Sequence, residues 1–108
     1  MPKTRTVDVK VPVRRPRDWP YDFSKVRVDD TVVIVPEPNN AVDKNALRID
    51  DLERGTLGYV PAPLAAKITP QLQAKAWALV GAQVTEIDRN ATWVDVFVSI
   101  RLKVPETN

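Results

Sequence analysis

The sequence predicts a mainly β domain: a small, partly open six-stranded β-barrel with two short helices. Apolar and polar residues alternate over several short segments, which is the period of half-buried strands. Prolines, asparagines and aspartates separate these segments at short intervals, as turns between strands require. Helical spacing occurs only late in the chain, before the last two predicted strands.

Four predicted strands occupy the first part of the chain. Residues 6–13 carry a valine at every second position, and Pro12 favours a place at the edge of the sheet. Residues 31–35 form an apolar run, which indicates a central strand. Residues 46–49 and 56–60 are expected to form two short strands joined by a turn.

Two short helices are predicted next. Leu64 and Ile68 lie four residues apart, which fits a first helix after a pair of prolines. Thr69 and Pro70 have the character of an N-cap and a first helical position, and Gly81 would end this second helix. Trp77 would then lie in the second helix, facing the core.

The last two strands are predicted at residues 82–88 and 92–104, with a turn at residues 88–90. Alternation in the final strand separates an inward face from an outward face. The inward face comprises Val94, Val96, Val98, Ile100 and Leu102. The outward face comprises Trp93, Asp95, Phe97, Ser99 and Arg101.

Composition removes several classes of chemistry. The chain has no cysteine and no histidine, so thiolate catalysis, imidazole catalysis and the commonest zinc ligands are absent. The acidic pairs Asp29-Asp30 and Asp50-Asp51 are adjacent in sequence and would point to opposite faces, so no metal is expected. We expect no catalytic residue and no cofactor. No run approaches the about 20 apolar residues of a membrane span, and the N-terminus lacks the core of a signal peptide, so a cytoplasmic domain without a membrane partner is expected.

The loop at residues 14–25 combines charge with aromatic rings. Three cations precede three aromatic residues within ten positions, in a chain whose net charge is only +2. Binding sites for single-stranded nucleic acid need both, because cations contact phosphates and flat rings stack on bases. An aromatic plug that closes one end of the barrel is the alternative. The residues are Arg14, Arg15, Arg17, Trp19, Tyr21 and Phe23.

Two sequence blocks identify a relationship. Residues 37–46 read Glu-Pro-Asn-Asn-Ala-Val-Asp-Lys-Asn-Ala, and residues 58–61 read Gly-Tyr-Val-Pro just before the predicted helices. In this order and at this separation they resemble the signature of the HIRAN family. The resemblance covers residues 26–102 and implies one HIRAN-like domain over residues 1–108, with residues 14–25 as a loop insertion. The family fold is a modified barrel of the oligonucleotide-binding or SH3-like type.

The resemblance also implies a function. Members stand alone in bacteria and phages or precede fork-remodelling DNA helicases, so it implies a module for single-stranded DNA or DNA 3′ ends in repair or replication. In the helicase members the carboxylate matching Asp43 accepts a hydrogen bond from a terminal 3′-hydroxyl, and a basic residue at the end of the first strand, here Arg14 or Arg15, contacts the nucleic acid. Val42 replaces the aromatic residue that those members carry beside the aspartate. A valine cannot stack on a base.

Three further residues complete the predicted nucleic-acid site. Asn40 and Lys44 belong to the same turn as Asp43, where asparagine and aspartate side chains also bond to backbone amides and hold the loop. Tyr59 would lie at a strand end beside the groove, either stacking on a base or packing over the following helix.

A protein-interaction module is the alternative function. The same groove, or Trp93 and Phe97 on the outward face of the last strand, would dock a helicase, a nuclease or a second copy of the chain. We expect a monomer or a weak homodimer. A hydrolase is not supported, because the chain also lacks a phosphate-binding Gly-Lys-Ser/Thr loop.

Overall fold

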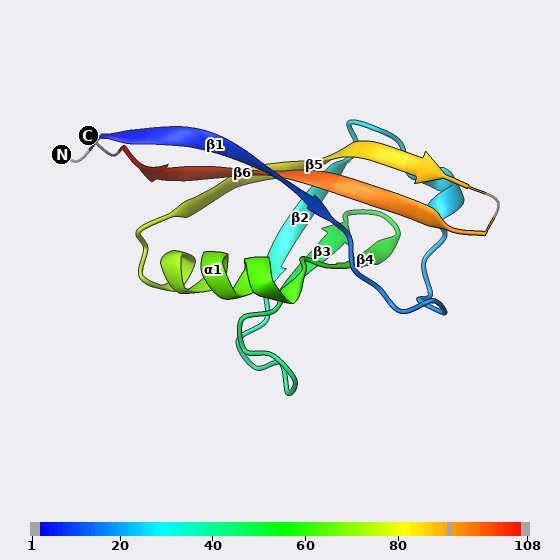
Figure 1. Ribbon diagram of the computed structural model, residues 1–108, viewed down its shortest axis with the longest axis horizontal. Helices are drawn as coiled ribbons and strands as arrows, with labels where there is room; N and C mark the ends of the chain where they lie inside the picture. The colour runs from blue at the N-terminus through cyan, green and yellow to red at the C-terminus, as the bar shows by residue number, and fades with distance from the viewer. Residues whose placement is uncertain (1–2, 91, 107–108) are drawn as a thin grey trace.

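The structure, a computed structural model, describes residues 3–90 and 92–106. Within these residues, six antiparallel strands form one curved sheet in the order β1-β6-β5-β2-β3-β4, and one α-helix lies against it (Figure 1). The elements in chain order are β1 (Thr4–Pro12), the 3-10 helix η1 (Phe23–Lys25), β2 (Thr31–Pro36), β3 (Leu47–Asp51), β4 (Gly55–Tyr59), α1 (Ala62–Gln73), β5 (Ala78–Arg89) and β6 (Val94–Pro105).

The two edges of the sheet meet at one point. Just beyond the end of β1, Arg14 forms an isolated antiparallel bridge with Tyr59 at the end of β4. The two residues exchange backbone hydrogen bonds of 2.8 Å in both directions. The sheet is therefore closed at this corner and open elsewhere along its edges, which confirms the predicted partly open, mainly β architecture.

Gly58 makes this corner possible. A Cβ atom at Gly58 would lie 2.5 Å from the carbonyl oxygen of Arg14 and 2.8 Å from Cγ1 of Val13. Its φ of +155° is also one that L-residues rarely adopt. The backbone segment that comes so close to Gly58 is the one just after β1.

The core lies on the face of the sheet against which α1 packs, because Ala65 and Ile68 of α1 belong to it. Val96, Val98, Ile100 and Leu102 of β6 are at most 1% exposed, so the predicted inward face of the last strand is confirmed. Because residues two apart share a face of a strand, the same alternation directs Val11 of β1 to this core.

The two predicted helices are one helix, α1, and this prediction was wrong in two respects. Thr69 does not cap a new helix: it is buried within α1 and donates its hydroxyl to the carbonyl oxygen of Asn45 at 2.7 Å. Pro70 follows inside the last turn of α1. The helix ends at Gln73, so Trp77 lies after the helix, half-buried. In the part of the chain that the structure describes, no helix is long and apolar enough to cross a membrane.

Residues 78–81, which were predicted to form the end of the second helix, are the start of a strand. β5 begins at Ala78, and Gly81 lies at an irregularity in its pairing with β6 instead of ending a helix. The alternating contacts with β6 over twelve residues of β5 outweigh the local helical spacing of Leu72, Ala76 and Leu79.

Candidate nucleic-acid interface

A row of three side chains crosses the outer face of the sheet at the closed corner. Tyr59 pairs with Arg14 on one side and with Arg48 of β3 on the other. Side chains of directly opposed residues in antiparallel strands lie on the same face, about 4.5–5.5 Å apart at Cβ. The phenol ring of Tyr59 is therefore flanked by two guanidinium-bearing side chains. Arg14 is exposed, whereas Tyr59 and Arg48 are half-buried.

A surface pocket of about 540 Å³ adjoins this row. Tyr59 forms one part of its lining, and the turn that follows β2 forms most of the rest. Two residues of that turn matter for the predicted nucleic-acid site. Asn40 was predicted to belong to it, and Val42 replaces the aromatic residue of the helicase members. Besides Tyr59, the lining residues are Pro36 at the end of β2 and, from the turn, Glu37, Pro38, Asn39, Asn40, Ala41 and Val42.

Asn40 holds this turn together. Its side-chain oxygen accepts hydrogen bonds from the backbone N–H groups of Val42 and Asp43, at 2.9 and 3.0 Å. Its side-chain amide donates to Glu37 at 3.0 Å. Asp43 acts in the same way one step later, accepting from the backbone N–H of Asn45 at 2.9 Å. The turn chemistry expected for these residues is confirmed.

The turn leaves Val42 almost fully exposed at 96%. Lys44 is also exposed, and Asp43 is half-buried but does not line the pocket. Of the turn residues from Asn40 to Lys44, Asn40, Ala41 and Val42 line the pocket, whereas Asp43 and Lys44 do not.

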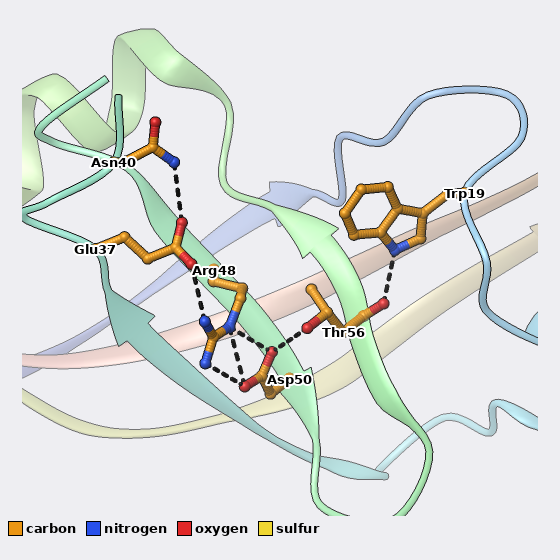
Figure 2. A network of polar contacts seen from close by, with 6 residues as sticks. All are labelled: Trp19, Glu37, Asn40, Arg48, Asp50 and Thr56. Atoms are coloured by element: carbon orange, nitrogen blue, oxygen red, sulfur yellow. Dashed lines mark hydrogen bonds and ion pairs between the residues drawn. The ribbon is translucent and has the colours of Figure 1, made fainter. Parts of the chain in front are cut away.

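Three charged residues that were not predicted for this site organise the row: Arg48, Glu37 and Asp50. Arg48 donates to Glu37 at 2.8 Å and to both oxygens of Asp50 at 2.9 Å (Figure 2). Hydrogen bonds from Asn40, and then from Tyr59 and Arg48, hold the pKa of Glu37 below its usual value. Asp50 and Glu37 raise the pKa of Arg48, which stays charged but is neutralised by its two partners. The opposite charges of Arg48 and Asp50 two residues apart on a strand were the available signal.

Trp19 extends the row on the side of β4. Its indole N–H donates to the carbonyl oxygen of Thr56 at 2.7 Å (Figure 2). Its ring meets that of Tyr59 edge to face, with centroids 6.2 Å apart and planes at 76°. Burial raises the pKa of Tyr59, and the carboxylate of Glu37 raises it further. The structure thus brings four predicted residues together: Arg14, Trp19, Asn40 and Tyr59. We call this set the Tyr59 face.

Arg15 points away from the Tyr59 face. Its guanidinium lies between two rings, 3.8 Å from the centroid of Phe23 and 4.1 Å from that of Trp93. It also donates to the carbonyl oxygen of Val94 at 2.6 Å, and burial lowers its pKa. Such a cation between aromatic faces stabilises the fold.

Tyr21 belongs to the same stack. Its ring packs on Phe23 with centroids 4.6 Å apart, and its hydroxyl donates to Asp51 at 2.8 Å. Burial raises the pKa of Tyr21 to about 12. Arg17, by contrast, is exposed in the loop between Arg15 and Trp19.

The two aromatic residues of the alternative surface, Trp93 and Phe97, are half-buried and in contact with cationic side chains. Trp93 precedes β6, stacks on Arg15 and donates its indole N–H to Asp95 at 2.8 Å. Phe97 is half-buried, with Nζ of Lys10 5.0 Å from its ring centroid. Asp95 lies on the face of β6 opposite the core, as predicted, and there it is half-buried and accepts the hydrogen bond from Trp93.

Comparison with known proteins agrees with this arrangement. The family model described as "HIRAN domain" matches residues 7–104. The crystal structure of the HIRAN domain of human HLTF is similar with a TM-score of 0.65 and 19% identity, over 89% of this chain and 78% of that one. A crystal structure of a protein from Lactobacillus plantarum gives a TM-score of 0.64 and 20% identity, over 92% of this chain and 98% of that one. No curated protein matches the sequence. The chain therefore belongs to the HIRAN domain family, a family of DNA-binding modules.

Proposed function

We propose that this chain is a binding module for single-stranded DNA and that the strand lies across the Tyr59 face. The observation that carries the proposal is the exposed guanidinium of Arg14 beside the ring of Tyr59 in a bridged pair. Sites for single strands combine cations that contact phosphates with rings that stack on bases, and these two neighbouring residues supply one of each. Membership of a DNA-binding family supports the same assignment.

The surrounding charges give different roles to Arg14, which belongs to the Tyr59 face, and to Arg48, which lies beside it. Arg48 is neutralised by Glu37 and Asp50, so it orients the turn and the ring of Tyr59. The structure gives the side chain of Arg14 no ion-pair partner among the described residues, so its charge is available to a phosphate. Each phosphate neutralised on a single strand releases counterions and contributes about 0.7 to the salt slope of binding.

The pocket favours an unstacked base. At about 540 Å³ it falls within the range of about 300–1,000 Å³ that holds small ligands. Bases in a duplex are stacked and paired, whereas a single strand can turn a base into the pocket beside Tyr59. We therefore propose a preference for single strands over duplex, in the repair or replication settings where such strands occur.

Recognition of the 3′ end is the weaker part of the proposed function. One oxygen of Asp43 already accepts the backbone N–H of Asn45, which leaves the other for a terminal 3′-hydroxyl. Val42 offers no ring to hold the terminal base. We propose general single-strand binding with little preference for an end.

Fluorescence anisotropy tests the proposal. A labelled strand of about ten thymidines, within the site size of such modules, is compared with a duplex of equal length between about 50 and 200 mM salt. Arg14→Ala is compared with Lys103→Ala, which removes the same charge from an exposed position on β6. We expect the single strand to bind more tightly, and Arg14→Ala to lower the salt slope by about 0.7.

Two results would contradict the proposal. One is the absence of single-strand binding at low salt. The other is an equal loss of affinity in Arg14→Ala and Lys103→Ala, which would show that only net charge matters. Melting curves of both variants check that neither change has unfolded the domain.

A further inference from the structure

Strand β1 presents an unpaired backbone edge. Val13 donates its N–H to Val96 at 2.9 Å, and Lys3 accepts from Glu106 at 2.9 Å, in the continuous β1–β6 register. Bonded pairs alternate in an antiparallel ladder, so the odd-numbered residues of β1 bond to β6. The N–H and C=O groups of Thr4, Thr6, Asp8 and Lys10 therefore point away from β6, and no described backbone group pairs with them.

An apolar groove of about 440 Å³ lies beside this edge, between β1, β6 and α1. We call it the β1 groove. It is far more apolar than the pocket beside Tyr59, and its residues come from elements that do not form the Tyr59 face. The principal apolar residues are Val7, Val9, Leu64, Ile68 and Trp77.

Two cations line the same groove. Arg5 belongs to β1 and Lys67 to α1, and both side chains are exposed. Neither has an ion-pair partner among residues 3–90 and 92–106. The other charges on β1, Asp8 and Lys10, are already paired with Arg101 and Glu86. The charge left over at the groove is positive.

We propose that the β1 edge and the β1 groove bind an extended, acidic segment of a partner protein. The segment adds to the sheet as a seventh strand beside β1 and places apolar side chains in the groove. In that pairing Val7 and Val9 occupy non-hydrogen-bonded positions, where opposed side chains approach most closely. A glutamate or aspartate beside Arg5 and Lys67 supplies the missing negative charge.

Charge complementarity selects this occupant over a second copy of the chain. Pairing β1 with the β1 strand of another molecule would add a second Arg5 and a second Lys67 to one apolar surface, and like charges in such a setting oppose association. Pro12 limits the available edge to residues 4–10, because it has no N–H to donate. A short peptide therefore spans the whole edge.

The structure specifies a probe. An acetylated and amidated peptide Glu-Phe-Thr-Val-Thr-Glu, antiparallel to β1, places its Phe and Val beside Val9 and Val7 and its final Glu beside Arg5. One control peptide carries proline in place of the first Thr, which removes the N–H aimed at Asp8. A second control carries Lys in place of both Glu residues. Fluorescence anisotropy of the labelled peptides measures binding to the intact chain.

Thr6→Pro is the decisive variant. It removes an N–H that points to the free edge and leaves the β1–β6 hydrogen bonds intact. Thr6→Ala is its matched control, because it removes the same side chain and keeps the N–H. We expect Thr6→Pro to weaken the peptide about five- to tenfold, the effect of one lost hydrogen bond, and Thr6→Ala to change little. Lys67→Glu should weaken the acidic peptide and improve the lysine peptide.

Each outcome decides the proposal. It is supported if the acidic peptide binds, the two control peptides bind less well, and Thr6→Pro but not Thr6→Ala lowers affinity at unchanged melting temperature. The proposal is overturned if the acidic peptide does not bind, or if the proline peptide binds as tightly as the acidic peptide. It is also overturned if the chain forms a homodimer that dissociates in Thr6→Pro. Oligonucleotide affinity should be the same in Thr6→Pro and the parent chain, so this test is separate from that of the Tyr59 face.

Discussion

Gly58→Ala tests whether the closed corner of the sheet holds both the fold and the Tyr59 face. The new methyl group would lie 2.5 Å from the carbonyl oxygen of Arg14, which is backbone and cannot rotate away. Relief requires that the end of β1 move off β4. That movement would break the two hydrogen bonds of 2.8 Å between Arg14 and Tyr59.

The cost can be worked from two effects. Overpacking a close contact costs about 1–3 kcal/mol, and a non-glycine residue in a sparsely populated backbone region costs about 1–3 kcal/mol. The sum, about 2–6 kcal/mol, is a large part of the about 5–15 kcal/mol that stabilises a domain. Each kcal/mol lowers the melting temperature of a domain of this size by about 4–8 °C, so we expect a fall of at least about 8 °C.

Gly81→Ala is the matched control. Nothing lies within 4 Å of a Cβ built at Gly81, and its backbone is not in the positive-φ region. Differential scanning calorimetry of the two variants gives the comparison, and anisotropy shows whether single-strand binding falls in Gly58→Ala but not in Gly81→Ala. Equal melting temperatures would refute the reasoning, because the bridge between Arg14 and Tyr59 would then tolerate a side chain at its closest contact.

Three other predictions follow from single side chains. Val96→Asp places a carboxylate in the core, at a residue that is 1% exposed, so we expect the free energy of unfolding to fall by several kcal/mol. Urea unfolding measures this change, and a fall below about 1 kcal/mol would contradict the assigned core. The pKa of Tyr21 is about 12 in the folded chain and about 10 in the unfolded chain. Its contribution to stability is therefore complete below pH 10 and is lost as the pH rises from about 10 to about 12. Absorbance titration should show this late ionisation, and Tyr21→Phe should abolish it. Oligonucleotides ending in 3′-hydroxyl and 3′-phosphate should bind almost equally, and a strong 3′-hydroxyl preference lost in Asp43→Asn would show that the chain does read the end.

The strands and the turn after β2 were predictable because their signals are local. Alternation fixes which residues of β6 face the core, and asparagine and aspartate side chains reach their own backbone within three residues. The bridge of Arg14 with Tyr59 was only partly predictable. A glycine such as Gly58 leaves room for another backbone segment, but the segment that approaches it lies more than forty residues earlier in the chain.

The role of Arg15 depends on contacts that no local pattern records. Its guanidinium lies against Trp93 and donates to Val94, seventy-nine residues away. Neighbouring Arg14 has the same chemistry and a similar sequence context, yet it remains exposed. Thr69 is a similar case, because its N-cap character is local and its hydrogen bond to Asn45 is tertiary. For Arg15 and for Thr69, a tertiary contact and not the local sequence determines where the side chain lies.

The most direct test of the central claim is a map of where single-stranded DNA binds. A titration of the uniformly ¹⁵N-labelled chain with a short thymidine strand reports on every backbone amide and on the side-chain amide of Asn40. We predict the largest shifts at Arg14, Trp19, Asn40 and Tyr59, with little change along β1. Shifts confined to β1 and α1, or to the stack around Arg15, would contradict the assignment of the Tyr59 face as the DNA-binding surface.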